Sequence, residues 1–153
     1  MLDKIDLQIL KILQEDLSIP ISRIAENVSL SISPCWRRIQ RLEKEGFIHK
    51  RVALLNAKKM GLGVTVFVSI KTNNHTQAWF KKFQQVIMEI PEVLEFYRMS
   101  GEVDYLLKVV VSSIESYDVV YKKLINNTDL LDVSSSFAME EMKYSTALPL
   151  EFN

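Results

Sequence analysis

Hydrophobic positions in the first 48 residues recur at the three- and four-residue spacing of an α-helix. The spacing predicts helices over about residues 4–15, 20–28 and 34–45. A tight turn at residues 29–31 separates the second helix from the third. This order of a helix, a short helix, a tight turn and a longer helix predicts a helix-turn-helix domain.

The third predicted helix has clear end signals and two different sides. Ser33 is expected as its N-cap, with Pro34 in the first helical position and Gly46 beyond its last residue. Its apolar side consists of Ile32, Cys35, Ile39 and Leu42. Its polar side presents Ser33, Arg37, Gln40, Arg41 and Lys44, with Trp36 at the boundary. Long cationic and amide side chains suit the DNA major groove, so we expect these six residues to bind DNA. An ordinary solvated helix face is the alternative, which Glu43 and Glu45 favour.

The hydrophobic period changes to two after residue 63. The pattern predicts, in order, a strand at 64–71, a helix at 77–89, strands at 93–99 and 105–111, a helix at 114–126 and a strand at 133–144. This βαββαβ order indicates an α+β, ferredoxin-like unit with two helices on one face of a four-stranded sheet. The other face would carry Phe67 and further apolar side chains without cover, which indicates a two-fold homodimer.

The segment between the two patterns indicates a domain boundary. Residues 50–55 are expected to be extended, as a wing or an interdomain strand, and residues 56–63 contain two glycines. We therefore expect a helix-turn-helix domain over 1–48, a linker strand over 49–62 and a second domain over 63–153. A continuous domain with a long loop is the alternative.

Charge separates the two halves although the net charge is zero. Residues 1–60 hold 11 Lys and Arg against 7 Asp and Glu, a net charge of +4, and the remaining residues hold 8 against 12, a net charge of −4. Only the basic front half is therefore expected to meet phosphate. The chain is 48% apolar, which is enough for a packed core.

The remaining reactive residue types predict little chemistry. Cys35 is the one cysteine and lies on an apolar stripe, so we expect a buried side chain without a disulfide. His49 and His75 are isolated, so neither a metal site nor a cofactor is expected. The sequence shows no signal peptide and no apolar run that could cross a membrane, so we expect an intracellular, cytoplasmic protein.

Two polar segments of the back half are candidate ligand sites. In the segment 100–105, Gly101 permits a positive φ, and Asp104 can accept hydrogen bonds from a ligand ammonium group or from loop amides. Periodicity alone favours a plain hairpin turn there. Three serines at 134–136 either line a polar pocket or are simply solvated. No nucleophile elbow, glycine-rich phosphate loop or paired His and carboxylate cluster occurs, so we do not expect an enzyme.

Several segments together are distinctive. They are DLQIL at 6–10 with Leu13 in the first helix, SPCWRRI at 33–39 with RLE at 41–43, GFI at 46–48, ALLN at 53–56, SG at 100–101 with DYLLK at 104–108, and MEE at 139–141. In these segments the chain resembles the leucine-responsive regulatory protein (Lrp/AsnC) family along nearly its whole length. The resemblance implies an N-terminal winged helix-turn-helix and a C-terminal βαββαβ effector and oligomerisation domain.

The resemblance also implies a function. Members of the family are transcription regulators of double-stranded DNA that respond to small molecules, commonly amino acids, and often assemble dimers into octamers. Their effector site lies near the loop that matches Ser100, Gly101 and Asp104, where the carboxylate would meet an amino acid's ammonium group. Ser134, Ser136 and Phe137 lie where selection of the effector side chain is expected. A cytoplasmic, nucleoid-associated regulator is therefore expected. The alternatives are an architectural DNA-binding protein without an effector and an amino-acid-sensing regulatory subunit.

Overall fold

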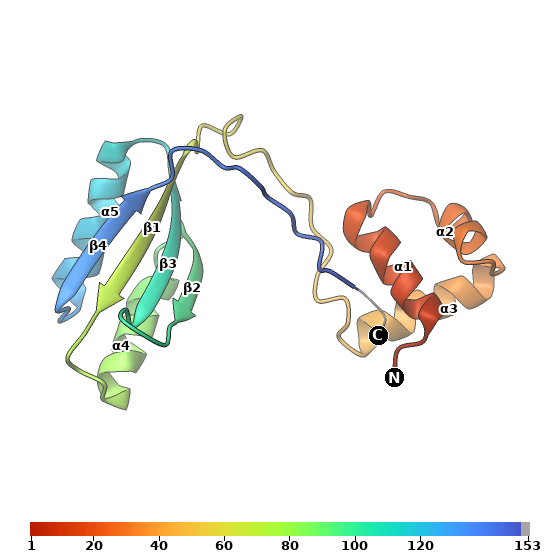
Figure 1. Cartoon of the computed structure of the whole chain (residues 1–153), viewed down its shortest axis with the longest axis horizontal. Coiled ribbons are helices and arrows are strands. Elements are labelled where there is room, and N and C mark those ends of the chain that lie inside the picture. The colour runs from red at the N-terminus through yellow and green to blue at the C-terminus, as the bar shows by residue number, and fades with distance from the viewer. Residues whose placement is uncertain (151–153) are drawn as a thin grey trace. The chain divides into compact units, whose positions relative to one another are not determined.

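The computed structural model describes residues 1–150 of the 153-residue chain. It divides into two compact units, which are Met1–Leu54 with the tail from Met142, and Leu55–Glu141. Figure 1 shows the labelled elements of both units. The expected second domain, 63–153, includes this tail, whereas in the structure the tail packs with the first unit.

The first unit is built from α1 (Lys4–Glu15), α2 (Ile21–Asn27) and α3 (Ile32–Lys44), which confirms the helices expected from the spacing. Asp3 caps α1, because its side chain accepts the backbone N–H of Asp6 at 2.8 Å. The Asp6 side chain accepts the backbone N–H of Asp3 in return, which completes a capping box.

The beginning of α3 differs from the expectation. Its N-cap is Ser31, and Ser33 and Pro34 lie inside the first turn, so the prediction that Ser33 is the cap was wrong. Proline is tolerated at this position because the N–H groups of the first helical turn have no intrahelical acceptor in any case.

The end of α3 confirms the expected role of glycine. Gly46 has φ of +80°, in the left-handed region. Its N–H donates to Glu43 O at 3.0 Å, and the N–H of Phe47 donates to Leu42 O at 2.9 Å. These two bonds form a Schellman motif, which ends the helix sharply.

Apolar side chains of all three helices form the core of the first unit. Its buried members are Ile9, Ile24, Ala25, Val28, Cys35, Ile39 and Leu42. Cys35 is fully buried, and burial raises the pKa of its thiol, so it acts as a small packing residue as expected.

The expected linker strand is not formed. Residues 49–56 belong to no strand, and a turn follows at 57–61. Val52, Leu54 and Leu55 are exposed. A strand needs a hydrogen-bonding partner, and the described part of this single chain offers none to this segment.

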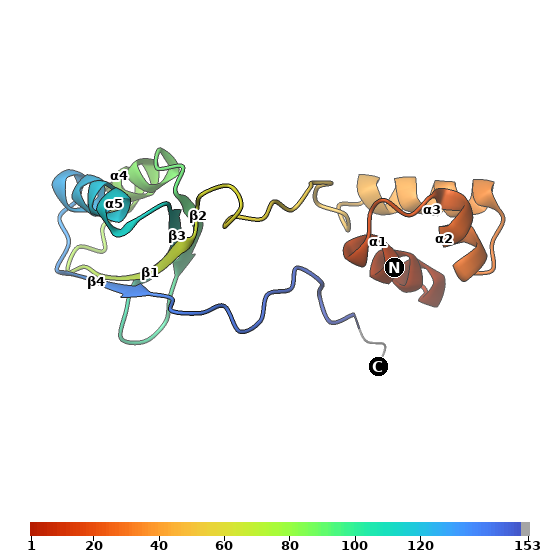
Figure 2. The same ribbon diagram turned by 90° about the horizontal axis from the view of Figure 1, so that it is seen from above.

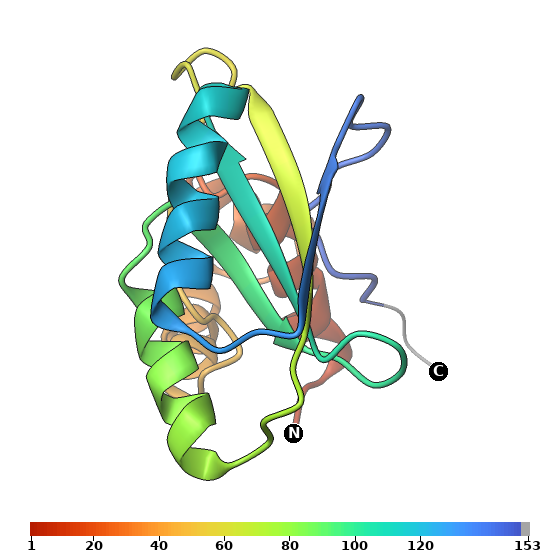
Figure 3. The same ribbon diagram turned by 90° about the vertical axis from the view of Figure 1, so that its left-hand side faces the viewer.

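The second unit confirms the βαββαβ order. Its elements are β1 (Val64–Lys71), α4 (Gln77–Met88), β2 (Val93–Arg98), β3 (Tyr105–Val111), α5 (Ile114–Asn127) and β4 (Asp132–Phe137). The strands form an antiparallel sheet in the order β2-β3-β1-β4. Figures 2 and 3 show α4 and α5 side by side on one face of this sheet.

The covered face of the sheet holds the core of the second unit. Inward residues of β1, such as Val66, Val68 and Ile70, are fully buried. Phe83 of α4 packs against Trp79, with ring centroids 5.0 Å apart, and against Tyr105, at 5.1 Å. Phe67 points to the opposite, open face and is 40% exposed, as the alternation predicted.

The last strand is shorter than expected. β4 ends at Phe137 rather than Tyr144, so Glu140 and Glu141 lie outside it. β4 pairs with β1, and the last bond joins the N–H of Ala138 to Thr65 O. The ladder ends there because β1 itself begins at Val64.

Candidate DNA-binding helix and effector site

α3 carries a row of exposed polar side chains, at successive spacings of four, three and four residues. This α3 row consists of Ser33, Arg37, Gln40 and Lys44. Trp36 lies at the edge of the row and is 47% exposed. Because the opposite side of α3 packs into the core, the α3 row is the side that this helix presents to solvent.

Arg37 and Lys44 supply the unpaired positive charge of the α3 row. Among the described residues, neither of them forms an ion pair. Glu43 is engaged by Arg51, so its charge is compensated away from the row. The side chains of the α3 row therefore carry two positive charges and no negative one, which suits contact with phosphate.

Arg41 lies in a different environment from the other predicted DNA-binding residues. Its Nη2 donates to Asp6 Oδ2, and Arg38 Nη1 donates to Asp6 Oδ1 at 2.8 Å. Arg38 Nη1 also donates to Asp3 Oδ2 at 2.6 Å. Asp6 is fully buried, whereas the side chains of Arg38 and Arg41 are 29% and 40% exposed. Arg41 thus joins α3 to α1, and its contact with DNA stays a prediction.

The carboxyl groups of this cluster are held ionised. For Asp6, burial is the largest influence and would raise the pKa. The hydrogen bonds from the Asp3 backbone, Arg38 and Arg41 outweigh it, so the pKa of Asp6 lies below its ordinary value. The backbone N–H of Asp6 and the guanidinium of Arg38 lower the pKa of Asp3 in the same way.

The loop between β2 and β3 holds three of the predicted effector-binding residues. Ser100 and Gly101 are exposed, and Gly101 has φ of +115°, which favours glycine. Asp104 is half-buried, and its Oδ2 accepts the backbone N–H of Thr72 at 2.8 Å. Its own N–H donates to Ile70 O at 2.9 Å. One carboxylate oxygen therefore anchors the loop to the end of β1, and Oδ1 is the oxygen available to a ligand.

Ser134 and Ser136, the other predicted effector-binding residues, are exposed on β4. Ser135 between them faces α5, where its hydroxyl contacts that of Tyr117, so its two neighbours face the open side of the sheet. Figures 2 and 3 show the β2–β3 loop projecting to this same side, away from α4 and α5. The loop and the two serines thus share one side of the sheet, although the loop lies at its end and the serines lie on its edge strand.

Sequence reasoning missed the structural partners of these residues. Asp6 falls at helical spacing with Ile9 and Leu13, on the buried side of α1, and a carboxylate on an apolar stripe was the available signal. The contact between Thr72 and Asp104 left no signal, because it joins two loops 32 positions apart in the sequence.

Neither a cluster of metal ligands nor a membrane-spanning helix occurs in residues 1–150. No group of three or more His, Cys, Asp or Glu side chains there could hold a metal ion. Likewise, none of the helices described has the length and apolar character to cross a bilayer.

A helix-turn-helix with a basic exposed row, followed by a separate βαββαβ unit, defines the class of DNA-binding regulators with a ligand-binding domain. Comparison with known families supports both parts. The family model for a winged helix-turn-helix DNA-binding domain matches residues 2–49, and that for the Lrp/AsnC ligand binding domain matches residues 65–148. The chain belongs to the Lrp/AsnC family of DNA-binding transcriptional regulators.

Individual relatives cover nearly the whole chain. The DNA-binding transcriptional activator DecR of Escherichia coli is 50% identical over 99% of this chain and 100% of its own length. The glutamate uptake regulatory protein of Zymomonas mobilis is 50% identical over 97% and 91%. Among solved structures, an AsnC family transcriptional regulator from Agrobacterium tumefaciens has a TM-score of 0.93 and 54% identity, with 97% of each chain covered. A transcriptional regulator from Neisseria meningitidis in complex with L-Met has a TM-score of 0.92 and 33% identity, also with 97% of each chain covered.

Proposed function

We propose that the chain regulates transcription in the cytoplasm, on nucleoid DNA, as a homo-oligomer whose DNA binding or assembly responds to an amino acid. The observation that carries the DNA part is the α3 row, in which Arg37 and Lys44 are exposed and unpaired within the described residues. Arg37 and Gln40 are the side chains suited to base edges, Ser33 and Lys44 suit phosphate, and Trp36 borders the contact. Two copies related by a two-fold axis would read half-sites about 34 Å apart, or a multiple of that distance.

The open face of the sheet supports a dimer. Phe67 lies on it between Lys108 and Ser136 of the neighbouring strands, and Tyr97 is 49% exposed on β2. Apolar and aromatic side chains that no element of the second unit covers are typical of an interaction surface. We propose that this face pairs with a second copy, and that dimers assemble further into octamers.

The effector proposal rests on the open side of the second unit. The exposed Gly101 turn and the Oδ1 atom of Asp104 suit an amino acid's carboxylate and ammonium groups. The hydroxyls of Ser134 and Ser136 suit a polar or small side chain. A relative with 33% identity was solved with L-Met, and another is named for glutamate uptake, so an amino acid is the class of ligand we propose.

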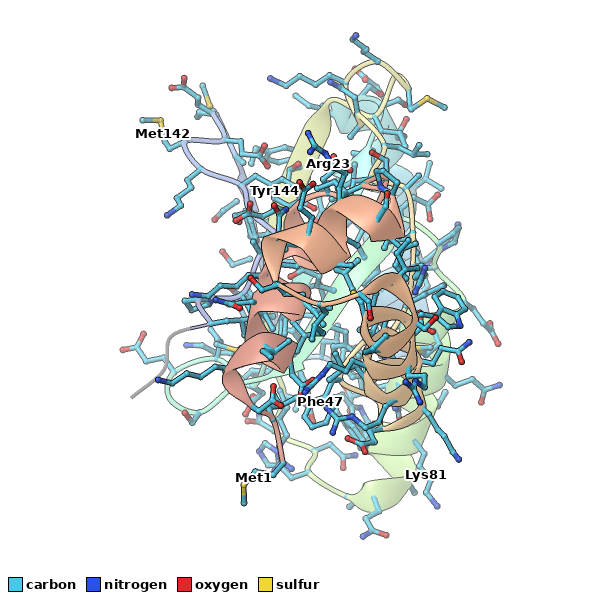
Figure 4. All side chains as sticks on the ribbon, turned by 90° about the vertical axis from the view of Figure 1, so that its right-hand side faces the viewer. Met1, Arg23, Phe47, Lys81, Met142 and Tyr144 are labelled. Carbon is cyan, nitrogen blue, oxygen red and sulfur yellow. The ribbon has the colours of Figure 1, made fainter. Side chains whose placement is uncertain are left out.

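A two-part experiment tests this function. Thermal unfolding of the full chain in the presence of each amino acid should show a stabilising shift with one or a few of them, and Asp104→Ala should abolish the shift. Gel shifts on a DNA duplex selected from a random pool should show at least tenfold weaker binding by Arg37→Ala, with unchanged binding by Lys81→Ala on α4 (Figure 4).

The outcomes separate the alternatives. DNA binding without any amino-acid shift would indicate an architectural protein. An amino-acid shift without salt-dependent DNA binding would indicate a regulatory subunit. Normal binding by Arg37→Ala would remove the α3 row as the DNA-reading surface.

A further inference from the structure

The first unit buries a charged side chain in its centre. Asp6 is fully buried, although a carboxylate is among the groups that are most costly to remove from water. It lies on α1 and its guanidinium partners lie on α3, so the cluster crosses from one helix to the other.

Asp6 uses both carboxylate oxygens in directed bonds. Oδ1 accepts from Arg38 Nη1 at 2.8 Å, and Oδ2 accepts from Arg41 Nη2 and from the backbone N–H of Asp3 at 3.1 Å. Arg38 and Arg41 are three residues apart, so they lie one above the other on the same side of α3. Two such bonds to one fixed carboxylate define how far α3 is rotated about its own axis.

That rotation decides which residues face outward. At about 100° per residue, the four members of the α3 row lie roughly 100–160° around the helix from Arg38. Arg38 and Arg41 are thereby engaged by the buried Asp6, while Arg37 and Lys44 remain unpaired within the part of the chain that is described. Only half of these four cations of α3 are then free to meet phosphate.

We propose that Asp6 is a positioning residue for DNA binding, which sets the rotation of α3 and withholds Arg38 and Arg41 from phosphate. It touches no DNA itself. The proposal rests on the α3 row being the DNA-reading surface. Its function is selectivity, because guanidiniums bound to Asp6 cannot add sequence-independent affinity.

Asp6→Asn in the full chain tests this role, because asparagine keeps the shape and removes the charge. Release of the guanidiniums should steepen the slope of log K against log salt on a random-sequence duplex by about 0.9 for each one that reaches phosphate. The preference for a selected duplex over the random one should fall about tenfold. A merely structural role would lower the fraction of folded protein and leave both the slope and the preference unchanged.

Asp16→Asn is the matched control, since Asp16 is the C-cap of the same helix and, among residues 1–150, its side chain bonds only to Ser18. It removes the same charge from the same unit and should change neither readout. An unchanged slope in Asp6→Asn with a retained helical circular-dichroism spectrum would overturn the proposal.

If Asp6→Asn does not fold, Arg41→Gln tests the role of Asp6 instead. This variant leaves Asp6 paired with Arg38, and it should leave the salt slope unchanged, whereas Arg37→Gln should reduce the slope by about 0.9. A reduction by Arg41→Gln equal to that by Arg37→Gln would overturn the role given to Asp6. An unchanged slope in Arg37→Gln would instead contradict the α3 row as the DNA-reading surface.

Discussion

Ionisation of the Asp6 side chain makes the stability of the first unit depend on pH. The pKa of Asp6 is lowered in the folded state from the ordinary value of 3.8, because the bonds from the Asp3 backbone, Arg38 and Arg41 outweigh the opposing effect of burial. A group with a lowered native pKa stabilises the fold above its unfolded pKa. That contribution is lost as the pH falls below 3.8 through the native pKa.

We expect Asp6→Asn to lower the free energy of unfolding of the first unit by about 1–3 kcal/mol at neutral pH. The value lies below that for a fully buried pair, because Arg38 and Arg41 are partly exposed and can return to water. The difference between wild type and variant should shrink as the pH is lowered below 3.8, because the Asp6 carboxylate is then progressively protonated. Urea unfolding monitored by circular dichroism at several pH values measures this, and a difference independent of pH would contradict the assignment.

The end of α3 is a test at the scale of one element. Gly46 has φ of +80°, and a Cβ atom placed there would meet nothing within 4 Å, so alanine would suffer only the backbone cost of the left-handed region. We expect Gly46→Ala to destabilise the first unit by about 1 kcal/mol. Gly63→Ala is the control, since Gly63 also has no neighbour within 4 Å and lacks the positive φ. Thermal unfolding of the two variants measures the difference, and equal unfolding midpoints for Gly46→Ala and Gly63→Ala would exclude a strained C-terminal cap.

Elements were predictable from the sequence where they carry their own periodicity. The helices and strands follow from apolar spacing, because burying a stripe or a face is what stabilises them. The end of β4 was not predictable, because it depends on where β1 begins. The prediction of a linker strand was wrong for a similar reason, because hydrophobic periodicity does not show whether a partner strand is present.

The candidate sites divide in the same way. The α3 row follows from spacing on one helix, and the turn at Gly101 follows from a single residue type. Hydrogen bonds join Arg41 to Asp6 and Asp104 to Thr72 across 35 and 32 positions of the sequence, so only the folded chain reveals them. They are also the contacts that change how Arg41 and Asp104 are interpreted.

At the scale of the whole molecule, two chain segments connect the units. One is the linker that follows α3, and the other is the tail, which leaves β4 and belongs to the first unit from Met142 onward. Gln14 of α1 holds this tail, because its side chain accepts the N–H of Leu148 at 2.8 Å and donates to Leu148 O at 2.9 Å. The strand that carries Ser134 and Ser136 is therefore continuous with a segment bound to α1.

Dimer formation through the open face of the sheet can be tested by a substitution on that face. In a two-fold dimer each substitution on this face occurs twice. Complete burial of a phenylalanine contributes about 1.5–3 kcal/mol, and Phe67, which is 40% exposed, would contribute a fraction of that in each copy. Phe67→Lys would replace that contribution with a second cation beside Lys108. We expect sedimentation equilibrium to show a monomer for Phe67→Lys and the wild-type mass for Met88→Lys, since Met88 ends α4 and is 75% exposed. A wild-type mass for Phe67→Lys would move the dimer contact away from this face.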